Sequence, residues 1–198
     1  MQKLVIGLAA AIILGIAGTM AWMLSNPTPS SLMNAGGVTL GGPFELTAHT
    51  GQRMSSKQVI DRPALVYFGY TFCPDVCPVD VQHMVDTTEI LAKKGIDVRP
   101  VFISVDPGRD TVKALAEYAE AMSPRMIALT GTEAEVKAAI RSYGGAFSLG
   151  KADANGSYLV SHSTFTYIMT PDRGMVGIMR RKFTPEVMAR DVRKALGK

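Results

Sequence analysis

The spacing of apolar residues changes along the chain after residue 40, and it predicts strands alternating with helices. Residues 64–70 (ALVYFGY) form a continuous apolar run that is too short for a helix and rich in strand-forming residues, which predicts a buried central strand. Residues 78–94 place apolar side chains three and four positions apart, as in an amphipathic helix. Residues 98–105 predict a second buried strand.

Capping residues mark the helices that follow. We expect Asp110 to cap a helix that runs to residue 121, and residues 126–130 predict a short strand. Thr132 and Glu135 have the spacing of a capping box, which predicts a further helix up to residue 143.

Two hairpins and a last helix complete the pattern. Residues 44–48 and 53–56 flank a His-Thr-Gly turn, and residues 164–170 and 175–179 flank a Pro-Asp-Arg-Gly turn. Thr184 precedes a proline at the first helical position and so begins a helix that runs to residue 196. These elements predict an α/β fold with a central sheet flanked by helices.

The N-terminal segment has a different pattern. Residues 4–24 are apolar or small and carry no charge, and 21 helical residues span about 31 Å, close to the thickness of a bilayer core. The run ends in Trp22-Met23-Leu24, which suits a membrane interface better than a signal-peptidase site. We therefore predict an uncleaved transmembrane signal anchor over residues 1–24, with a cleaved secretory signal as the alternative.

The anchor sets the expected location of the rest of the chain. Lys3 before the apolar run places the N-terminus in the cytoplasm by the positive-inside rule. Residues 25–40 are rich in Pro, Ser, Asn and Gly and predict a flexible linker to a domain over residues 41–198. We expect a single-pass protein of a bacterial inner membrane, with its C-terminal domain in the periplasm.

Composition and charge exclude several classes of protein. Two cysteines are too few for a disulfide-framework scaffold. The net charge of +4 comes from 21 basic and 17 acidic residues, and the densest basic stretch is Arg180-Arg181-Lys182. Because that stretch has no interleaved aromatic residues and no neighbouring basic stripe, we expect no nucleic-acid partner.

Both cysteines lie between the first long strand and the helix after it. In an open α/β sheet this is the carboxyl end of a strand, where ligands bind. Pro78 indicates that Cys73 to Cys77 is an irregular loop and that the helix begins at the proline. The helix N-terminus then favours thiolate, which is both a nucleophile and a metal ligand. Two buried structural cysteines, or a structural disulfide, are the alternatives.

Three histidines are candidates to complete a metal site. His49 falls in the first hairpin turn, where an exposed side chain is expected, and His83 lies on the helix but off its apolar stripe. His162 lies in a loop just ahead of a strand. Two thiolates and one imidazole are soft ligands that suit copper, whereas a closed structural zinc site takes four protein ligands. The twelve methionines are spread along the chain and are assigned mainly to packing.

Four segments together resemble the Sco/SenC family of membrane-anchored, thioredoxin-like copper proteins. They are residues 42–46 (GPFEL), 67–78 (YFGYTFCPDVCP), 103–111 (ISVDPGRDT) and 161–163 (SHS). The resemblance extends from about residue 41 to the C-terminus. It implies a thioredoxin-like fold for residues 41–198.

The resemblance also implies a function. Copper, as Cu(I) and Cu(II), would be bound by Cys73, Cys77 and His162 and delivered to the dinuclear CuA centre of cytochrome c oxidase subunit II. Other periplasmic copper or thiol-redox proteins are further expected partners. Asp75 lies inside the matching loop, where it would tune the site, and Asp106 would lie near the same sheet edge.

Other functions remain open at this stage. In a thiol–disulfide oxidoreductase, Cys73 and Cys77 would form a redox pair that reduces the cysteines of the oxidase copper site. A peroxidase is less compatible, because peroxiredoxins place Thr three residues before the reactive cysteine, where this chain has Tyr70. A copper sensor is a further alternative. Whether the chain is an enzyme therefore depends on thiol exchange.

Overall fold

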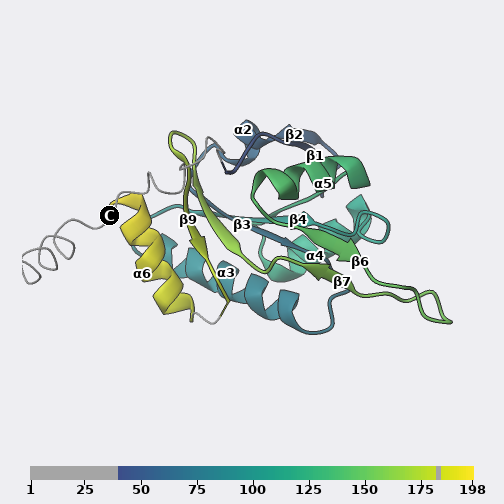
Figure 1. Cartoon of the computed structure of the whole chain (residues 1–198). Helices are drawn as coiled ribbons and strands as arrows, with labels where there is room; N and C mark the ends of the chain where they lie inside the picture. Colours follow the sequence, from purple (N-terminus) through teal and green to yellow (C-terminus); the bar gives the residue numbers. More distant parts are fainter. Residues whose placement is uncertain (1–39, 182–183) are drawn as a thin grey trace, which may run out of the picture. The chain divides into compact units, whose positions relative to one another are not determined.

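The apolar run at residues 64–70 forms the interior of the sheet in the computed structural model. It gives β3 (Ala64–Gly69), and every residue of this strand is buried. β3 pairs in parallel with β4 (Arg99–Ser104), which pairs in parallel with β5 (Ile127–Thr130). On its other side β3 pairs antiparallel with β8 (Thr166–Thr170), which forms a hairpin with β9 (Gly174–Met179). β3 therefore has a strand on each side and lies inside the sheet (Figure 1).

The first predicted hairpin extends the far edge of the sheet. β1 (Glu45–Ala48) and β2 (Arg53–Ser55) pair antiparallel, and β1 also pairs with β5. The sheet thus has seven strands in the order β2-β1-β5-β4-β3-β8-β9. A short helix that was not predicted, α2 (Ser56–Val59), follows β2.

Helices cover the two faces of the sheet. α3 (Val76–Ala92), α4 (Val112–Met122) and α6 (Pro185–Leu196) lie on one face, and α5 (Glu133–Ser142) lies on the other (Figure 1). α6 begins as predicted, because Pro185 is its first residue and the Thr184 hydroxyl accepts a hydrogen bond from the third. The predicted α/β architecture is confirmed.

The helix termini confirm one capping prediction and correct another. Thr132 and Glu135 form the predicted capping box at the start of α5. Asp110 does not cap α4. Thr111 does, by accepting a hydrogen bond from the Ala114 N–H. Asp110 is instead buried and accepts hydrogen bonds from the backbone and hydroxyl of Thr71 and from the Ser104 hydroxyl. Asp110 thus ties the loop after β3 to the end of β4.

A second, two-stranded sheet was not predicted. β6 (Phe147–Leu149) and β7 (Val160–His162) pair antiparallel, with Phe147 opposite His162. The two strands are connected by a ten-residue stretch that extends away from the main sheet (Figure 1). Strands of three residues are too short to leave a clear alternation in the sequence.

The structure describes residues 40–181 and 184–198. Within these ranges no helix is long and apolar enough to span a membrane. The predicted anchor and almost all of the predicted linker lie outside the described residues.

Asp110→Ala is expected to lower the free energy of unfolding by about 3 kcal/mol, because it leaves the N–H and hydroxyl of Thr71 and the buried Ser104 hydroxyl without their acceptor. Thr111→Ala removes only the helix cap and is expected to cost about 1 kcal/mol. Urea denaturation of both variants beside the unmodified chain measures the difference. Equal losses in the two variants would contradict the assignment of Asp110 as an interior tie.

Candidate metal centre

The two cysteines lie at the carboxyl end of β3, where the chain turns into α3. The Cys73 N–H donates to the Tyr70 carbonyl at 3.3 Å, which forms a turn directly after the strand. α3 begins at Val76, so Cys77 lies in its first turn and Pro78 is its third residue. The expectation that Pro78 begins the helix was therefore wrong by two positions. The first-turn N–H groups of a helix have no partner within the helix, so a proline there removes no hydrogen bond.

His162 reaches the cysteines from the second sheet. It is the last residue of β7, so the expectation that it lies in a loop was wrong, and pairing with Phe147 fixes its backbone. Its Nε2 lies 3.1 Å from Cys77 Sγ, across 85 residues of sequence. The fold therefore joins two of the three predicted ligands directly.

The second nitrogen of His162 sets the chemical form of the ring. Nδ1 lies 3.1 Å from the Ser163 carbonyl, and a carbonyl only accepts, so Nδ1 carries the proton and Nε2 presents its lone pair. Burial lowers the pKa of His162, although the hydrogen bond to Ser163 acts in the opposite direction. The Tyr67 and Tyr70 rings stand edge-on to the imidazole, with centroids 6.1 and 5.9 Å away. His162 thus offers a neutral, oriented imidazole to the Cys77 sulfur.

The two thiols differ in exposure and acidity. Cys77 is fully buried, and burial together with the Cys73 thiol raises its pKa to about 12. Burial would also raise the pKa of Cys73, but the Asp75 N–H, the Cys77 side chain and the N–H groups of Cys77 and Val76 together outweigh it, and the pKa is lowered. The Cys77 N–H lies 3.4 Å from Cys73 Sγ. At neutral pH Cys77 therefore carries its proton and donates it to His162 Nε2.

These three side chains have the chemistry of a copper site. Two sulfurs and an imidazole nitrogen are soft donors that suit Cu(I) and also accept Cu(II). The structure links Cys77 to His162 through their side chains and to Cys73 through a backbone N–H. Among the residues described, no three His, Cys, Asp or Glu side chains already stand in the arrangement of a metal site. Enclosing an ion between all three would therefore require these side chains to move, and Cys73 and His162 are half-buried whereas Cys77 is buried.

The two acidic residues expected near the site, Asp75 and Asp106, differ in their surroundings. Asp75 is exposed directly before α3, and its side chain makes no capping hydrogen bond. Asp106 is fully buried and accepts hydrogen bonds from Arg109 Nε at 2.5 Å and from the Tyr158 hydroxyl at 2.7 Å. The Arg109 guanidinium lies 3.7 Å from the Tyr158 ring centroid and 5.0 Å from that of Phe72. This group holds the β4–α4 loop against both the cysteine loop and the segment leading to β7.

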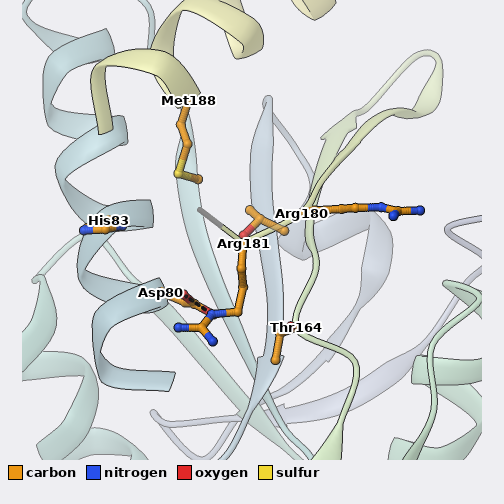
Figure 2. Close-up of a pocket in the computed structure, with 7 residues that line it drawn as sticks. Asp80, His83, Thr164, Arg180, Arg181 and Met188 are labelled. Atoms are coloured by element: carbon orange, nitrogen blue, oxygen red, sulfur yellow. Dashed lines mark hydrogen bonds and ion pairs between the residues drawn. The ribbon is translucent and has the colours of Figure 1, made fainter. Parts of the chain in front are cut away.

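The other two histidines have different surroundings. His49 is half-buried rather than exposed, because its Nδ1 accepts a hydrogen bond from the Ala128 N–H at 3.2 Å. His83 lies on α3, beside a small hollow that is also lined by Asp80, Arg181 and Met188. In Figure 2 its ring points away from these three side chains.

A chain of side chains beside the site was not predicted. The Tyr67 hydroxyl donates to Asp80 at 3.0 Å, and Arg181 Nε donates to the other oxygen of Asp80 at 3.1 Å. The sequence held one signal, because Cys77 and Asp80 are three residues apart on a helix and so share a face. The other two partners come from β3 and from the segment after β9, and nothing in their local sequence indicates the contact.

Comparisons with known sequences agree on one family. A family model for SCO1/SenC matches residues 33–197. Protein SenC of Rhodobacter capsulatus is 46% identical over 153 residues, which cover 77% of this chain and 69% of that protein. The human mitochondrial SCO1 homolog is 42% identical over 135 residues, which cover 67% of this chain but 45% of the human protein. The chain thus spans less than half the length of this human relative.

A comparison with a solved structure agrees with the sequence comparisons. Arabidopsis thaliana ScoI with copper bound matches with a TM-score of 0.76 and 35% sequence identity, over 80% of this chain and 99% of that one. The described fold is therefore that of a thioredoxin-like Sco protein. With the family model covering residues 33–197, the chain belongs to the SCO1/SenC family.

Proposed function

We propose that this chain is a copper metallochaperone that binds Cu(I) and Cu(II) through Cys73 Sγ, Cys77 Sγ and His162 Nε2. It delivers the ion to the CuA centre of cytochrome c oxidase subunit II. The observation that carries the proposal is the 3.1 Å approach of the His162 nitrogen to the Cys77 sulfur from a separate sheet. The bound copper in the Arabidopsis relative supports copper as the cargo.

The exposure of the three ligands suits a cargo that is handed on. Cys77 is buried, whereas Cys73 and His162 are half-buried. A partner's thiol can therefore approach the ion from the side of Cys73, while Cys77 and His162 hold it from within. Three protein ligands leave a coordination position for the incoming ligand, which a closed four-ligand site lacks.

We further propose that residues 1–24 anchor the domain in a bacterial inner membrane, with residues 41–198 in the periplasm. The uncharged apolar run of residues 4–24 supports this location. Anchoring would confine the copper site to the membrane surface, where an oxidase subunit with an exposed metal-binding domain is reached by diffusion in two dimensions.

The unequal thiols support a second candidate function, reduction of the disulfide of the oxidase copper site. The lowered pKa and greater exposure of Cys73 make it the attacking thiolate. Its sulfur would bond to one partner sulfur, and the other partner sulfur would leave as a thiolate. Cys77 would then transfer its proton to His162 and attack Cys73, which releases the partner as a dithiol and leaves this chain oxidised.

Copper titration of the full-length chain tests the ligand set. We expect one ion per chain, with a sulfur-to-Cu(II) charge-transfer band, and loss of tight binding in Cys73→Ser and Cys77→Ser. His162→Ala should weaken Cu(II) binding by more than the roughly 10–100-fold that loss of an outer-shell partner costs. Cu(I) binding should fall less, because two thiolates still hold the soft ion.

His83→Ala provides the matched control, because it removes a histidine from the helix that carries Cys77. Its copper affinity and spectrum should equal those of the unmodified chain. Unchanged affinity for both oxidation states in His162→Ala would show that the ligand assignment is wrong.

Copper loading should release protons and weaken in acid. At neutral pH Cys77 is protonated, because its pKa is raised to about 12, so the ion must displace that proton. Cys73 and His162 gain their protons at lower pH than they would if free, because the pKa of each is lowered. Between about pH 8 and pH 6 the apparent Cu(I) affinity should fall by about one to two powers of ten per pH unit. Competition with a chelator of known pH dependence measures this slope, and a flat profile would contradict thiol ligation.

Trapping of mixed disulfides tests the second function. Cys77→Ser keeps the attacking thiol and removes the resolving one, so it should accumulate a covalent adduct with a disulfide-bonded CuA-domain substrate. Cys73→Ser should accumulate far less, because Cys77 is buried and protonated. Equal trapping by the two variants would rule out the assigned order of attack.

A further inference from the structure

A hydrogen-bonded chain connects the protein surface to the metal centre. The Tyr67 hydroxyl donates to one oxygen of Asp80, and Arg181 Nε donates to the other. Tyr67 is fully buried, the Asp80 side chain is 12% exposed and the Arg181 side chain is 42% exposed. Figure 2 shows Arg181 extending toward Asp80, with a dashed line between them, and Arg180 pointing in another direction. The carboxylate is thus held on both sides by defined donors.

The inner end of this chain lies against the ligands. The Tyr67 ring meets the His162 imidazole edge-on, with an interplanar angle of 87°. Burial raises the pKa of the Tyr67 hydroxyl, and so do the Cys77 and Asp80 side chains beside it. Asp80 is three residues beyond Cys77 on α3, so the carboxylate and the sulfur share a helix face. The phenol is therefore hydrogen-bonded to Asp80 and lies beside the His162 ring and the Cys77 side chain.

This arrangement determines which acceptor receives the Tyr67 hydroxyl proton. Tyrosine has one hydroxyl proton, and an ionised carboxylate can only accept, so the 3.0 Å bond directs that proton to Asp80. The proton is then withheld from the Cys77 sulfur. Hydrogen bonds to a copper-bound cysteine sulfur tune the reduction potential of the ion, because they withdraw electron density from the metal–sulfur bond.

We infer that Asp80 is a positioning residue of the copper site, which keeps the Tyr67 hydroxyl proton off the Cys77 sulfur. Arg181 fixes the carboxylate in the orientation that does so. The inference rests on the proposed function, because it concerns copper held by Cys77. It gives this chain a means of keeping Cys77 a strong electron donor although a phenol lies beside it.

Asp80→Asn tests the inference in the full-length, copper-loaded chain. Arg181 still requires an acceptor, so the amide oxygen should face Arg181 and the amide nitrogen should face the phenol oxygen. The phenol proton then turns to Cys77. The sulfur-to-Cu(II) band should move to shorter wavelength and the Cu(II)/Cu(I) potential should rise. Asp80→Glu keeps a carboxylate, so its band should stay at the wavelength of the unmodified chain.

Removal of the hydroxyl separates this effect from loss of charge. Tyr67→Phe alone should leave the band in place, and Asp80→Asn should no longer shift it in a Tyr67→Phe background. Asp86→Asn removes the same charge from the same helix at a site where Gln82 is the hydrogen-bond donor, and it should also leave the band in place. Each of these results supports the assigned role of the phenol.

Two results would overturn the inference. One is a shift of the band in Tyr67→Phe alone, which would show that the hydroxyl already bonds to the sulfur in the unmodified chain. This measurement can be made even if the Asp80 variants do not fold. The other is a shift of the band by Asp80→Asn that persists in the Tyr67→Phe background. That result would show that the shift comes from loss of the carboxylate charge and not from the phenol proton. Failure of the proposed function looks different, because the unmodified chain would then show neither stoichiometric copper binding nor the charge-transfer band.

Discussion

The site depends on the interior position of β3 and on the opposite directions of its two neighbours. β4 runs parallel to β3, so the loops that follow both strands meet at one edge of the sheet. β8 runs antiparallel, and Tyr67 near the end of β3 pairs with Thr166 at the start of β8. The segment before β8 must therefore lie at the edge where β3 ends. His162 is four residues before Thr166, and this register brings it to the cysteine loop from 85 residues away.

Strand register places these segments at the same edge, and buried polar groups then fix their detail. Asp110 holds Thr71, and so the start of the cysteine loop, to the end of β4. Asp106 holds Arg109, whose guanidinium stacks on Tyr158 and approaches Phe72. Both carboxylates belong to the short segment after β4. That segment therefore positions the cysteine loop on one side and the approach to β7 on the other.

The sequence predicts the elements well where one local pattern suffices, as in the apolar run of β3, the capping box of α5 and the Thr184-Pro185 start of α6. It also identifies Cys73, Cys77 and His162 as the candidate ligands. The errors share a cause. Asp110 has the residue type of a cap, but donors from two other segments, at Thr71 and Ser104, compete for its carboxylate. His162 follows a segment with no clear period, and its strand exists only through pairing with β6. The Tyr67–Asp80–Arg181 chain joins three distant segments, so no local pattern could predict it.

The inequality of the two thiols links the two candidate functions. In the proposed thiol exchange Cys73 attacks first, because it is the more acidic and accessible sulfur, and in the proposed copper transfer the ion is also reached from the side of Cys73. A chain that holds copper through both sulfurs has no free thiolate with which to attack a disulfide, and an oxidised chain has no thiolate with which to bind copper. One molecule therefore cannot perform both tasks at once. If both serve the same oxidase subunit, reduction of its cysteines and delivery of its copper require either two molecules of this chain or one molecule that is reduced and loaded between the two steps.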